Sequence, residues 1–421
     1  MGGIVLATDI SAIEQAPDTK VSEAIAQPEP GLTPSELLRR AQELRPRLRA
    51  AEEDCERQGR VPQEINDALD AAGFYRIIQL KRFGGYEFDV ATYYRVMMEL
   101  ARGSTEIGWV LALVAGQPVV LGKFSEQAQR EAYGATGEFR AAGSFAPPGK
   151  AIPVPGGYRV TAGWRNGSGV DIATHFMPLV MIQGDGEPVP AQILVDRSQY
   201  EIVDDWDVIG MRGTGSKKVV AEDIFVPEHR VMRCHGMARG AEPLSLKCTT
   251  SDNPMYSTAI SPFLISQTAS VAVGTARAAL DHYEDILWHK KASYPPYLEK
   301  FNDPIHQRNY GTAARLVATA ESALIGAGHE FMEYARQEQE EGIPFDDARS
   351  IRLRAIAVQS AQLGWEAFQM IFHAGGTSTA AREGHPLTRI LRNFAVLKTH
   401  AVLQLEDAAG VMGRVQFGLG R

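Results

Sequence analysis

The spacing of hydrophobic and polar positions divides the chain of 421 residues into three regions. Between residues 32 and 136, apolar residues recur with the period of a helix, so we predict an N-terminal α-helical domain there. Its first helix should begin after Thr33, because Thr followed by Pro34 and then by Glu36 forms a capping-box start. The nearly continuous apolar run from Trp109 to Leu121 predicts a buried helix.

The pattern changes between residues 137 and 240, where short segments rich in Val, Ile and Tyr alternate with Gly and Pro. They follow one another at hairpin spacing without helical patterns between them, which predicts strands. The predicted strands are RAAGSFAPPG, GYRVTAGW, THFMPLVMI, AQILVDR, YEIVDDW and KKVVAEDIFVP. We expect a compact antiparallel β-domain, a barrel or a sandwich, and not a doubly wound nucleotide-binding fold.

From residue 241 onward the helical period returns in four long segments. They begin at SPFLIS, HQRNYG, FDDARS and PLTRIL, and each carries an apolar stripe. Four such helices are the parts of a bundle, so we predict a C-terminal four-helix-bundle domain over residues 241–421. Residues 1–31 precede the first helical pattern and are expected to form a flexible tail. The predicted fold class is therefore α+β.

Composition and charge narrow the functional classes. Apolar residues make up 44% of the chain and charged residues 22%, which is usual for a soluble globular protein. The net charge of −8 argues against nucleic acid as a partner, because phosphate binding needs a basic surface. No apolar segment reaches the roughly 20 residues that span a bilayer, and the N-terminus lacks a basic lead. We expect a cytoplasmic protein without membrane contact.

The cysteines predict neither a disulfide framework nor a metal site. They are odd in number, and no two have metal-ligand spacing: Cys55, Cys234 and Cys248. Free thiols in a reducing compartment are the simplest interpretation. We therefore predict no bound metal.

A glycine-rich turn directly precedes the last predicted strand. In DVIGMRGTGSKKVVAEDIFVP (residues 207–227), Gly213 and Gly215 flank Thr214 before an alternating apolar run. Glycine at these positions permits positive φ angles and close backbone approach. The G-x-G precedes a strand and not a helix, so it fails the test for a dinucleotide-binding motif. We expect the turn to serve mainly the shape of the β-domain, with cofactor contact secondary.

Three motifs together resemble the acyl-CoA dehydrogenase superfamily, over about residues 33 to 415. They are W-x-V-x-G-M-R-G-T-G-S from Trp206 with the strand ending in D-I-F-V-P, AAGFYRIIQLKRFGGYEFD, and FHAGGTS. The resemblance implies a helical N-terminal domain, a central antiparallel β-barrel domain and a C-terminal four-helix bundle. It also implies a flavin between the β-domain and the bundle, and a homotetramer.

The superfamily contains different chemistries. Many acyl-CoA dehydrogenases use a Glu on the last helix as a base, eight residues after an Arg-Asp pair. Here the matching pair is Arg392-Asn393, so the base position falls around His400 and Ala401, and the first carboxylate beyond it is Glu406. This departure argues against oxidation of an acyl thioester, and an FAD-dependent acyl-CoA dehydrogenase-like oxidoreductase is kept as the alternative function.

A sister group fits the site residues better: the two-component (group D) flavin-dependent monooxygenases of the hydroxyphenylacetate and secosteroid hydroxylase type. The matching residues are Gly143, Ser144, Trp164, Asn166, Ser168, Thr399 and His400. Many members have a His where this chain has Gln117. A glutamine can hydrogen-bond but cannot take up a proton at neutral pH, which suggests a substrate other than a simple phenol.

This resemblance implies an oxygenase component that receives reduced flavin (FADH2 or FMNH2) from a separate flavin reductase. With O2 the flavin forms a C4a-hydroperoxyflavin, which hydroxylates an aromatic or heteroaromatic small molecule. Ser168 is our candidate for holding the flavin N5 proton, Ser144 for lining the same face, and His400 for the base that activates the substrate. The expected cofactor contacts are Ser144, Trp164, Asn166, Ser168, Gly169, Gly375, Gly376 and Thr377. The expected substrate contacts are Trp109, Gln117 and His400.

Other interpretations of these residues stay open. His400 lies among apolar residues in LKTHAVLQL, within the last predicted helix, and a lone His there is commonly a packed or surface residue. Ser168 within Gly-Ser-Gly is equally compatible with an ordinary turn. A flavin-free scaffold of the same fold is a third possible function. The substrate and the choice between FMN and FAD are left open.

Overall fold

The computed structural model describes residues 24–235, 242–243, 247–377 and 379–419. Residues 1–23 of the predicted flexible tail therefore lie outside the described residues. The remainder of that tail is held against the helical domain: Ile25 forms a bridge with Phe83, and Gln27 Nε2 donates to the carbonyl oxygen of Gly85 at 2.6 Å. These two contacts connect residues 25 and 27 to the loop after residue 80, and the predicted boundary of the tail stays a prediction.

The N-terminal region is helical, as predicted. Thr33 caps the first helix, and its side chain accepts a hydrogen bond from Glu36 N at 3.2 Å. The buried segment after Trp109 is two helices and not one, because Pro118 has no N–H to donate to the preceding turn. The elements are α1 (Pro34–Ala50), α2 (Glu52–Gln58), α3 (Gln63–Ala71), η1 (Phe74–Arg76), α4 (Val90–Gly103), α5 (Thr105–Val114), α6 (Gln117–Leu121) and α7 (Glu126–Tyr133).

The central region forms one mixed sheet. In the described residues the strand order is β6-β7-β2-β1-β3-β4-β8-β9, with β5 paired to β3. The strands are β1 (Ala141–Val154), β2 (Gly157–Gly167), β3 (His175–Ile182), β4 (Val189–Ile193), β5 (Val195–Asp196), β6 (Glu201–Val203), β7 (Lys217–Pro227), β8 (Val231–His235) and β9 (Glu242–Pro243).

The predicted antiparallel barrel is wrong in two respects. β1 pairs with β3 in parallel, and the path of described strands ends at β6 and β9 without closing. The parallel pair arises because β2 turns back on one edge of β1, while η2 (Val170–Ile172) returns the chain to the other edge. Hairpin spacing identified strands, but it could not identify this crossover.

In the C-terminal region, the described residues form three long helices and a fourth that is interrupted. The long helices are α8 (Ser261–His289), α9 (Pro304–Glu341) and α10 (Asp347–Gly375). The fourth was predicted as continuous from Pro386, but it consists of α11 (Pro386–Leu397), η8 (Ala401–Leu403) and α12 (Leu405–Gln416). Gln404 Nε2 donates to the carbonyl oxygens of Lys398 at 2.8 Å and His400 at 3.0 Å, and so satisfies backbone acceptors that a helix would have paired.

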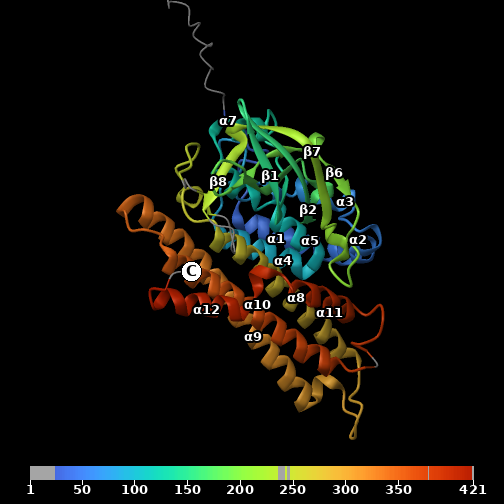
Figure 1. Ribbon diagram of the computed structural model, residues 1–421. Helices are drawn as coiled ribbons and strands as arrows, with labels where there is room; N and C mark the ends of the chain where they lie inside the picture. The colour runs from blue at the N-terminus through green and yellow to red at the C-terminus, as the bar shows by residue number, and fades with distance from the viewer. Residues whose placement is uncertain (1–23, 236–241, 244–246, 378, 420–421) are drawn as a thin grey trace, which may run out of the picture.

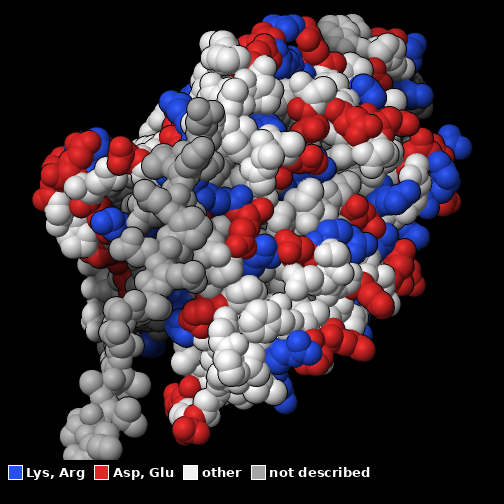
Figure 2. All heavy atoms as spheres, turned by 90° about the horizontal axis from the view of Figure 1, so that it is seen from above, with Lys and Arg blue, Asp and Glu red and all other residues white. Residues whose placement is uncertain are grey.

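Figure 1 shows the sheet and the N-terminal helices as the upper body of the molecule, with the long bundle helices below. α5 lies between these parts, because it contacts α8 as well as β1 and η4 (Arg212–Thr214). Acidic and basic side chains are interspersed over the face seen in Figure 2. Among the helices that the structure describes, none combines the length and apolarity needed to cross a membrane. The predicted domain boundaries at residues 31, 136 and 240 stay predictions.

Candidate active site

Three of the predicted site residues come together, although they lie far apart in the sequence. Trp109 Nε1 donates to Ser168 Oγ at 3.2 Å. The Trp109 ring also meets the His400 ring, with centroids 5.2 Å apart and an edge-on angle of 69°. The structure thus joins α5, the turn after β2 and the segment between α11 and α12 at one place.

The turn after β2 brings Ser168 to α5. Asn166 and Gly169 both have positive φ, +59° and +74°, so the chain reverses tightly around Ser168. A Cβ on Gly169 would lie 2.7 Å from Val114 Cγ2 and 3.0 Å from Val110 Cγ1. Gly169 therefore allows the turn to lie directly on α5. The Asn166 side chain is exposed at the start of this turn.

The glycine turn before β7 contacts Ser168 directly. Ser168 Oγ lies 2.7 Å from Ser216 Oγ, and Ser216 Oγ lies 2.7 Å from Thr214 Oγ1. Gly169 N also donates to the carbonyl oxygen of Thr214 at 3.0 Å. The sequence interpretation gave this turn mainly a role in shape and missed Ser216. The Thr and the Ser within GTGS were the available signal, because small hydroxyl side chains in a tight turn are placed to hydrogen-bond nearby groups.

Ser144 lies on β1 next to an irregularity in the sheet. The pairing of β1 with β3 shifts register between Ser144 and Gly149. Ser144 Oγ donates to the carbonyl oxygen of Arg165 at 2.6 Å, which fastens this irregular part of β1 to the end of β2. Gly143 lies close to Gln117, since a Cβ on Gly143 would be 3.6 Å from Gln117 Nε2. The start of β1 therefore borders the same region as α6.

Two glutamines add polar groups near this place. Gln117 is buried, its Nε2 donates to the carbonyl oxygen of Leu113 at 3.3 Å, and its Oε1 has no hydrogen-bond partner among the described residues. Gln267 on α8 is also buried, and its Oε1 is likewise unpaired there. Gly116 packs directly against Gln267, so both amides lie at the contact between α6 and α8. Gln267 was missed in the sequence, where nothing distinguishes it from other polar positions of α8.

His400 is not in a helix, contrary to the prediction, and caps η8. Its Nδ1 accepts from Val402 N at 3.5 Å, a contact too long to hold the ring in one tautomer. Burial lowers the pKa of His400 to about 4, although water reaches the side chain. His400 is thus neutral at neutral pH, and its pKa lies below the expected value near operating pH.

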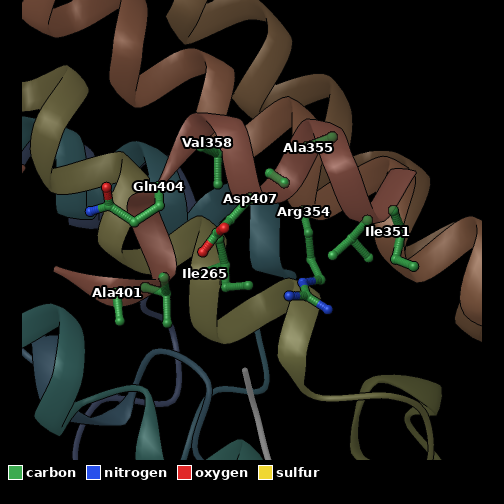
Figure 3. A pocket seen from close by; sticks show the side chains of 11 residues that line it. Ile265, Ile351, Arg354, Ala355, Val358, Ala401, Gln404 and Asp407 are labelled. Atoms are coloured by element: carbon green, nitrogen blue, oxygen red, sulfur yellow. The ribbon is translucent and has the colours of Figure 1, made fainter. Parts of the chain in front are cut away.

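The segment that carries His400 also borders a hollow of the bundle. Ala401, Val402 and Gln404 line it together with side chains of α8, α10 and α12 (Figure 3). The buried side chain of Leu403 in η8 and the side chain of Gln404 both hold the segment in place. α12 itself has no buried residue, but its Leu405 and Ala408 pack half-buried against the core.

Other predicted cofactor residues lie elsewhere. Trp164 is buried in the core of the β-domain, where its Nε1 donates to the carbonyl oxygen of Leu179 at 2.9 Å. Its assignment as a cofactor contact stays a prediction that these contacts do not support.

Gly375, Gly376 and Thr377 lie at the far end of the bundle. Gly375 approaches Ile286, near the C-terminus of α8. Gln267 and Ile286 are about 28 Å apart at the helical rise of about 1.5 Å per residue. One chain therefore does not bring Gly375 to Gln117 and its neighbours.

The glycine turn also anchors α11. Asn393 Oδ1 accepts from Met211 N at 2.7 Å, and a Cβ on Gly210 would collide with the carbonyl oxygen of Arg392. On its other side the turn meets α5, where Glu106 Oε1 accepts from Gly213 N at 3.0 Å. The turn therefore connects α5 with the helix that leads to His400.

Buried carboxyl groups surround this connection. Burial raises the pKa of Glu106 to about 8, against the opposing effect of the hydrogen bond from Gly213 N. Burial also raises the pKa of Glu52 to about 7, although Arg389 on α11 is an ion-pair partner at 3.3 Å. Glu106 is therefore protonated over much of the neutral range, which makes its burial less costly.

The described residues contain no group of three or more His, Cys, Asp and Glu side chains that could hold a metal ion. All three cysteines are buried free thiols: Cys55, Cys234 and Cys248.

Two protein families match the chain. Residues 39–135 match the family described as Acyl-CoA dehydrogenase, N-terminal domain, and residues 266–405 match Acyl-CoA dehydrogenase, C-terminal domain. Over 384 residues the chain is 32% identical to the flavin-dependent monooxygenase oxygenase subunit HsaA of Rhodococcus jostii (strain RHA1). That match covers 91% of this chain and 98% of the relative.

Solved structures agree with these matches over nearly the whole chain. The HsaA monooxygenase from Mycobacterium tuberculosis superposes with a TM-score of 0.81 at 27% identity, over 92% of this chain and 98% of that one. XiaF from Streptomyces sp., solved in complex with FADH2 and glycerol, superposes with a TM-score of 0.84 at 27% identity. The XiaF match covers 92% of this chain and 96% of that one.

Proposed function

The chain belongs to the flavin-dependent monooxygenase oxygenase subunits of the acyl-CoA dehydrogenase superfamily, and on this basis we propose that it hydroxylates an aromatic or heteroaromatic small molecule. It uses O2 and reduced flavin, which a separate flavin reductase supplies. The single observation that carries the proposal is the meeting of Trp109, Ser168 and His400 at one site. The prediction of a cytoplasmic location is retained as part of the proposal.

The groups at this site fit a reduced flavin. A flavin ring carries N–H donors along one edge and apolar faces on both sides. Ser168 Oγ is a buried oxygen next to α5 that can accept a hydrogen bond from such a donor. The indole of Trp109, which donates to Ser168, gives an apolar surface beside it. The ring would be held by Ser144, Asn166, Ser168 and Gly169, and when bound it supplies the activation of O2.

The chain's own residues orient the substrate and exclude water. Trp109 is buried and lies edge-on to His400, so an aromatic substrate beside His400 would meet an apolar wall. Gln117 and Gln267 both have unpaired amide oxygens at the contact between α6 and α8. These oxygens suit a substrate that carries an O–H or N–H donor. Because an amide cannot accept a proton, these two residues select and orient but do not ionise the substrate.

His400 is the proposed base. A neutral imidazole can accept the hydroxyl or ring N–H proton of the substrate, which makes the ring more electron-rich. The lowered pKa of His400 shows that burial disfavours the protonated ring, so this transfer is favourable only when negative charge develops on the substrate beside it. His400 would thereby act when a substrate is present and stay neutral otherwise.

We also propose a homotetramer. Gly375, Gly376 and Thr377 lie about 28 Å along α8 from the contact with α6, on the helical rise of about 1.5 Å per residue. These residues could contact the same cofactor as Ser168 only if they came from a neighbouring subunit. Light scattering should then give about four times the mass of one chain, and the mass of one chain would contradict this part of the proposal.

The dehydrogenase alternative is less well supported. It needs a carboxylate beside the substrate, and the base position falls at His400. Glu406, the first carboxylate beyond, is exposed on α12. No observation at the site favours this alternative over hydroxylation.

The proposal is tested by product analysis. Protein is mixed anaerobically with reduced FMN or reduced FAD and with a panel of phenols, indoles and other heteroaromatic compounds, and oxygen is then added. We expect a hydroxylated product with at least one compound and a clear preference for one flavin. Reduced flavin with O2 alone is the control, because it yields hydrogen peroxide without product.

Two results would contradict the proposal. One is stoichiometric hydrogen peroxide with every compound and both flavins. The other is reduction of protein-bound oxidised flavin by an acyl-CoA under anaerobic conditions, which would support the dehydrogenase alternative. A protein that binds neither flavin in either redox state would support the flavin-free scaffold.

A further inference from the structure

The hydroxyl groups of Ser168, Ser216 and Thr214 form a chain of hydrogen bonds with a definable direction. One end is Trp109 Nε1, which can only donate, and it lies 3.2 Å from Ser168 Oγ. The other end is the carbonyl oxygen of Met211, which can only accept, and it lies 2.7 Å from Thr214 Oγ1. Each hydroxyl in between has one proton to donate.

These end groups fix the direction of the inner bonds. Thr214 gives its proton to the Met211 carbonyl, so in its 2.7 Å contact with Ser216 it can only accept. Ser216 must then donate to Thr214, and in its 2.7 Å contact with Ser168 it accepts. Ser168 therefore donates its only proton to Ser216. Trp109 Nε1 already donates to one of the two lone pairs of Ser168 Oγ. Ser168 can therefore offer a ligand only its second lone pair, as a hydrogen-bond acceptor.

We propose that Thr214 and Ser216 are positioning residues that fix Ser168 as a hydrogen-bond acceptor, and that the site thereby selects reduced over oxidised flavin. This inference rests on the proposed contact between Ser168 and the flavin ring. Reduced flavin carries a proton on N5 and can donate to Ser168. Oxidised flavin has an unprotonated N5, which is itself an acceptor and would face the Ser168 lone pair without a proton between them.

Burial makes this arrangement persistent. Thr214, Ser216 and Ser168 have 1%, 4% and 8% of their surface exposed, so water does not readily replace a member of the chain. The backbone holds the turn in place as well, because Gly169 N donates to the carbonyl oxygen of Thr214. The fixed direction of this chain of hydrogen bonds, from Trp109 to Met211, thus gives the hydroxyls of the glycine turn a role beyond the shape of the β-domain.

The test compares dissociation constants of oxidised and reduced flavin, measured for FAD and FMN with dithionite as reductant under anaerobic conditions. The wild type should bind the reduced form more tightly. Ser216→Ala frees the Ser168 proton to turn toward the ligand. The dissociation constant of oxidised flavin divided by that of reduced flavin should therefore fall about three- to tenfold, as for one hydrogen bond of ordinary strength. A tenfold fall corresponds to a shift of about 30 mV in the two-electron potential of the bound flavin.

Variants of Thr214 separate the hydroxyl from the side-chain volume. Thr214→Val keeps the shape and removes the hydroxyl, and should lower the ratio in the same direction as Ser216→Ala. Thr214→Ser restores a hydroxyl and should return the ratio to the wild-type value. The Met211 carbonyl stays satisfied in the Val variant, because Trp206 Nε1 also donates to it at 2.9 Å. Folding is therefore expected to survive the change.

Ser360→Ala is the matched control, because this variant also removes a buried hydroxyl, one that donates only to its own helix at 2.9 Å. It should leave the ratio unchanged. Ratios within twofold of wild type in both Ser216→Ala and Thr214→Val would overturn the inference, as would a wild type that binds both redox forms equally. In those cases hydroxylated product would still support the proposed function. A wild type that binds neither form would overturn both.

Discussion

The β-domain side and the bundle side of the candidate site hold their functional groups differently. Ser168 is buried, lies in a turn packed directly on α5, and belongs to a chain of hydroxyl hydrogen bonds. His400 is accessible to water and lies in an irregular segment next to α12, which has no buried residue. The Ser168 side is fixed by several hydrogen bonds and by close backbone packing, whereas the His400 side is held by the buried Leu403 and by two hydrogen bonds from the Gln404 side chain.

This difference suits the two tasks of an oxygenase. A cofactor that is the same in every turnover is best met by preorganised groups, because they need no rearrangement when it binds. A substrate must enter and a product must leave, and such motions are carried by less tightly packed segments. We therefore expect variants on the Ser168 side to change flavin binding, and variants on the His400 side to change only substrate chemistry.

The largest effect is expected for His400→Asn. Loss of a general base lowers a rate by about 100-fold or more, so hydroxylation should fall by that order. Oxidation of reduced flavin should continue at the wild-type rate, because the Ser168 side is untouched. Product and hydrogen peroxide are measured together in single-turnover reactions.

His289→Asn is the control, since His289 is exposed at the C-terminus of α8. It should leave the amount of product unchanged. A His400→Asn enzyme that forms product within threefold of the wild-type rate would show that His400 is not the base.

The second-largest effect is expected at Gly210, where the glycine turn of the β-domain side packs against α11, the helix that leads to His400. In Gly210→Ala the added Cβ would collide with the backbone of α11 at Arg392, and overpacking of this kind costs about 1–3 kcal/mol. The free energy of unfolding in urea should fall by that amount, and product formation should fall with it. Gly311→Ala on α9 is the matched control, because its Cβ would meet nothing within 4 Å. A helix favours Ala over Gly by up to about 1 kcal/mol, so this control should be slightly more stable than wild type.

Much of the fold could be predicted, because helix periods and caps are local signals. Thr33 with Glu36 identified the start of α1, and the apolar stripes identified the bundle helices. The parallel pairing of β1 with β3 could not be predicted, since alternating polarity identifies a strand but not its partner. The interruption at His400 was missed for a related reason: its apolar period continues, while a side chain beyond it, Gln404, takes over the backbone acceptors.

Some residues of the candidate site could be predicted from the sequence, and others could not. The resemblance to known motifs selected Trp109, Ser168 and His400, and these three meet in the structure. Ser216 was missed because its contact with Ser168 joins residues 48 positions apart. Trp164 was selected by the same motif, but its indole fills the core of the β-domain. A motif records which residues recur together and does not say which of them face a ligand.

A smaller effect on stability is expected from Glu106, which supports the β-domain side through Gly213. Its pKa is raised by burial to about 8, above the ordinary value of 4.5, so between these pH values the folded protein binds more protons than the unfolded chain. The free energy of unfolding contributed by this group therefore falls as pH rises from about 4.5 to about 8.

Glu106→Gln cannot ionise and should lose less stability than wild type between pH 6 and pH 8.5. We expect a difference of about 1.4 kcal/mol or more, which corresponds to one pKa unit, from urea unfolding at both pH values. Exposed Glu187→Gln is the control and should behave as wild type. Parallel pH dependence of Glu106→Gln and wild type would mean that Glu106 is already ionised, and paired, at neutral pH.

The smallest effect is expected for Gln404→Ala on the bundle side. The variant loses two hydrogen bonds, to the carbonyl oxygens of Lys398 and His400, but the segment is accessible and water can replace them. The loss of stability should therefore be at most about 1 kcal/mol. A less restrained His400 should lower the product rate severalfold, while the preference for reduced flavin stays as in wild type.

Gln307→Ala provides the matched control, because Gln307 Nε2 donates at 2.9 Å to the carbonyl oxygen of Phe301 in the short helix η7 (Lys300–Asn302), in another part of the bundle. It should lose similar stability without a change in product rate. If Gln404→Ala altered the ratio of oxidised to reduced flavin binding as much as Ser216→Ala, the two sides of the site would be coupled and the distinction between them would fail. An unchanged ratio with a lower product rate would instead show that the sequence separates cofactor binding from substrate chemistry at the level of single side chains.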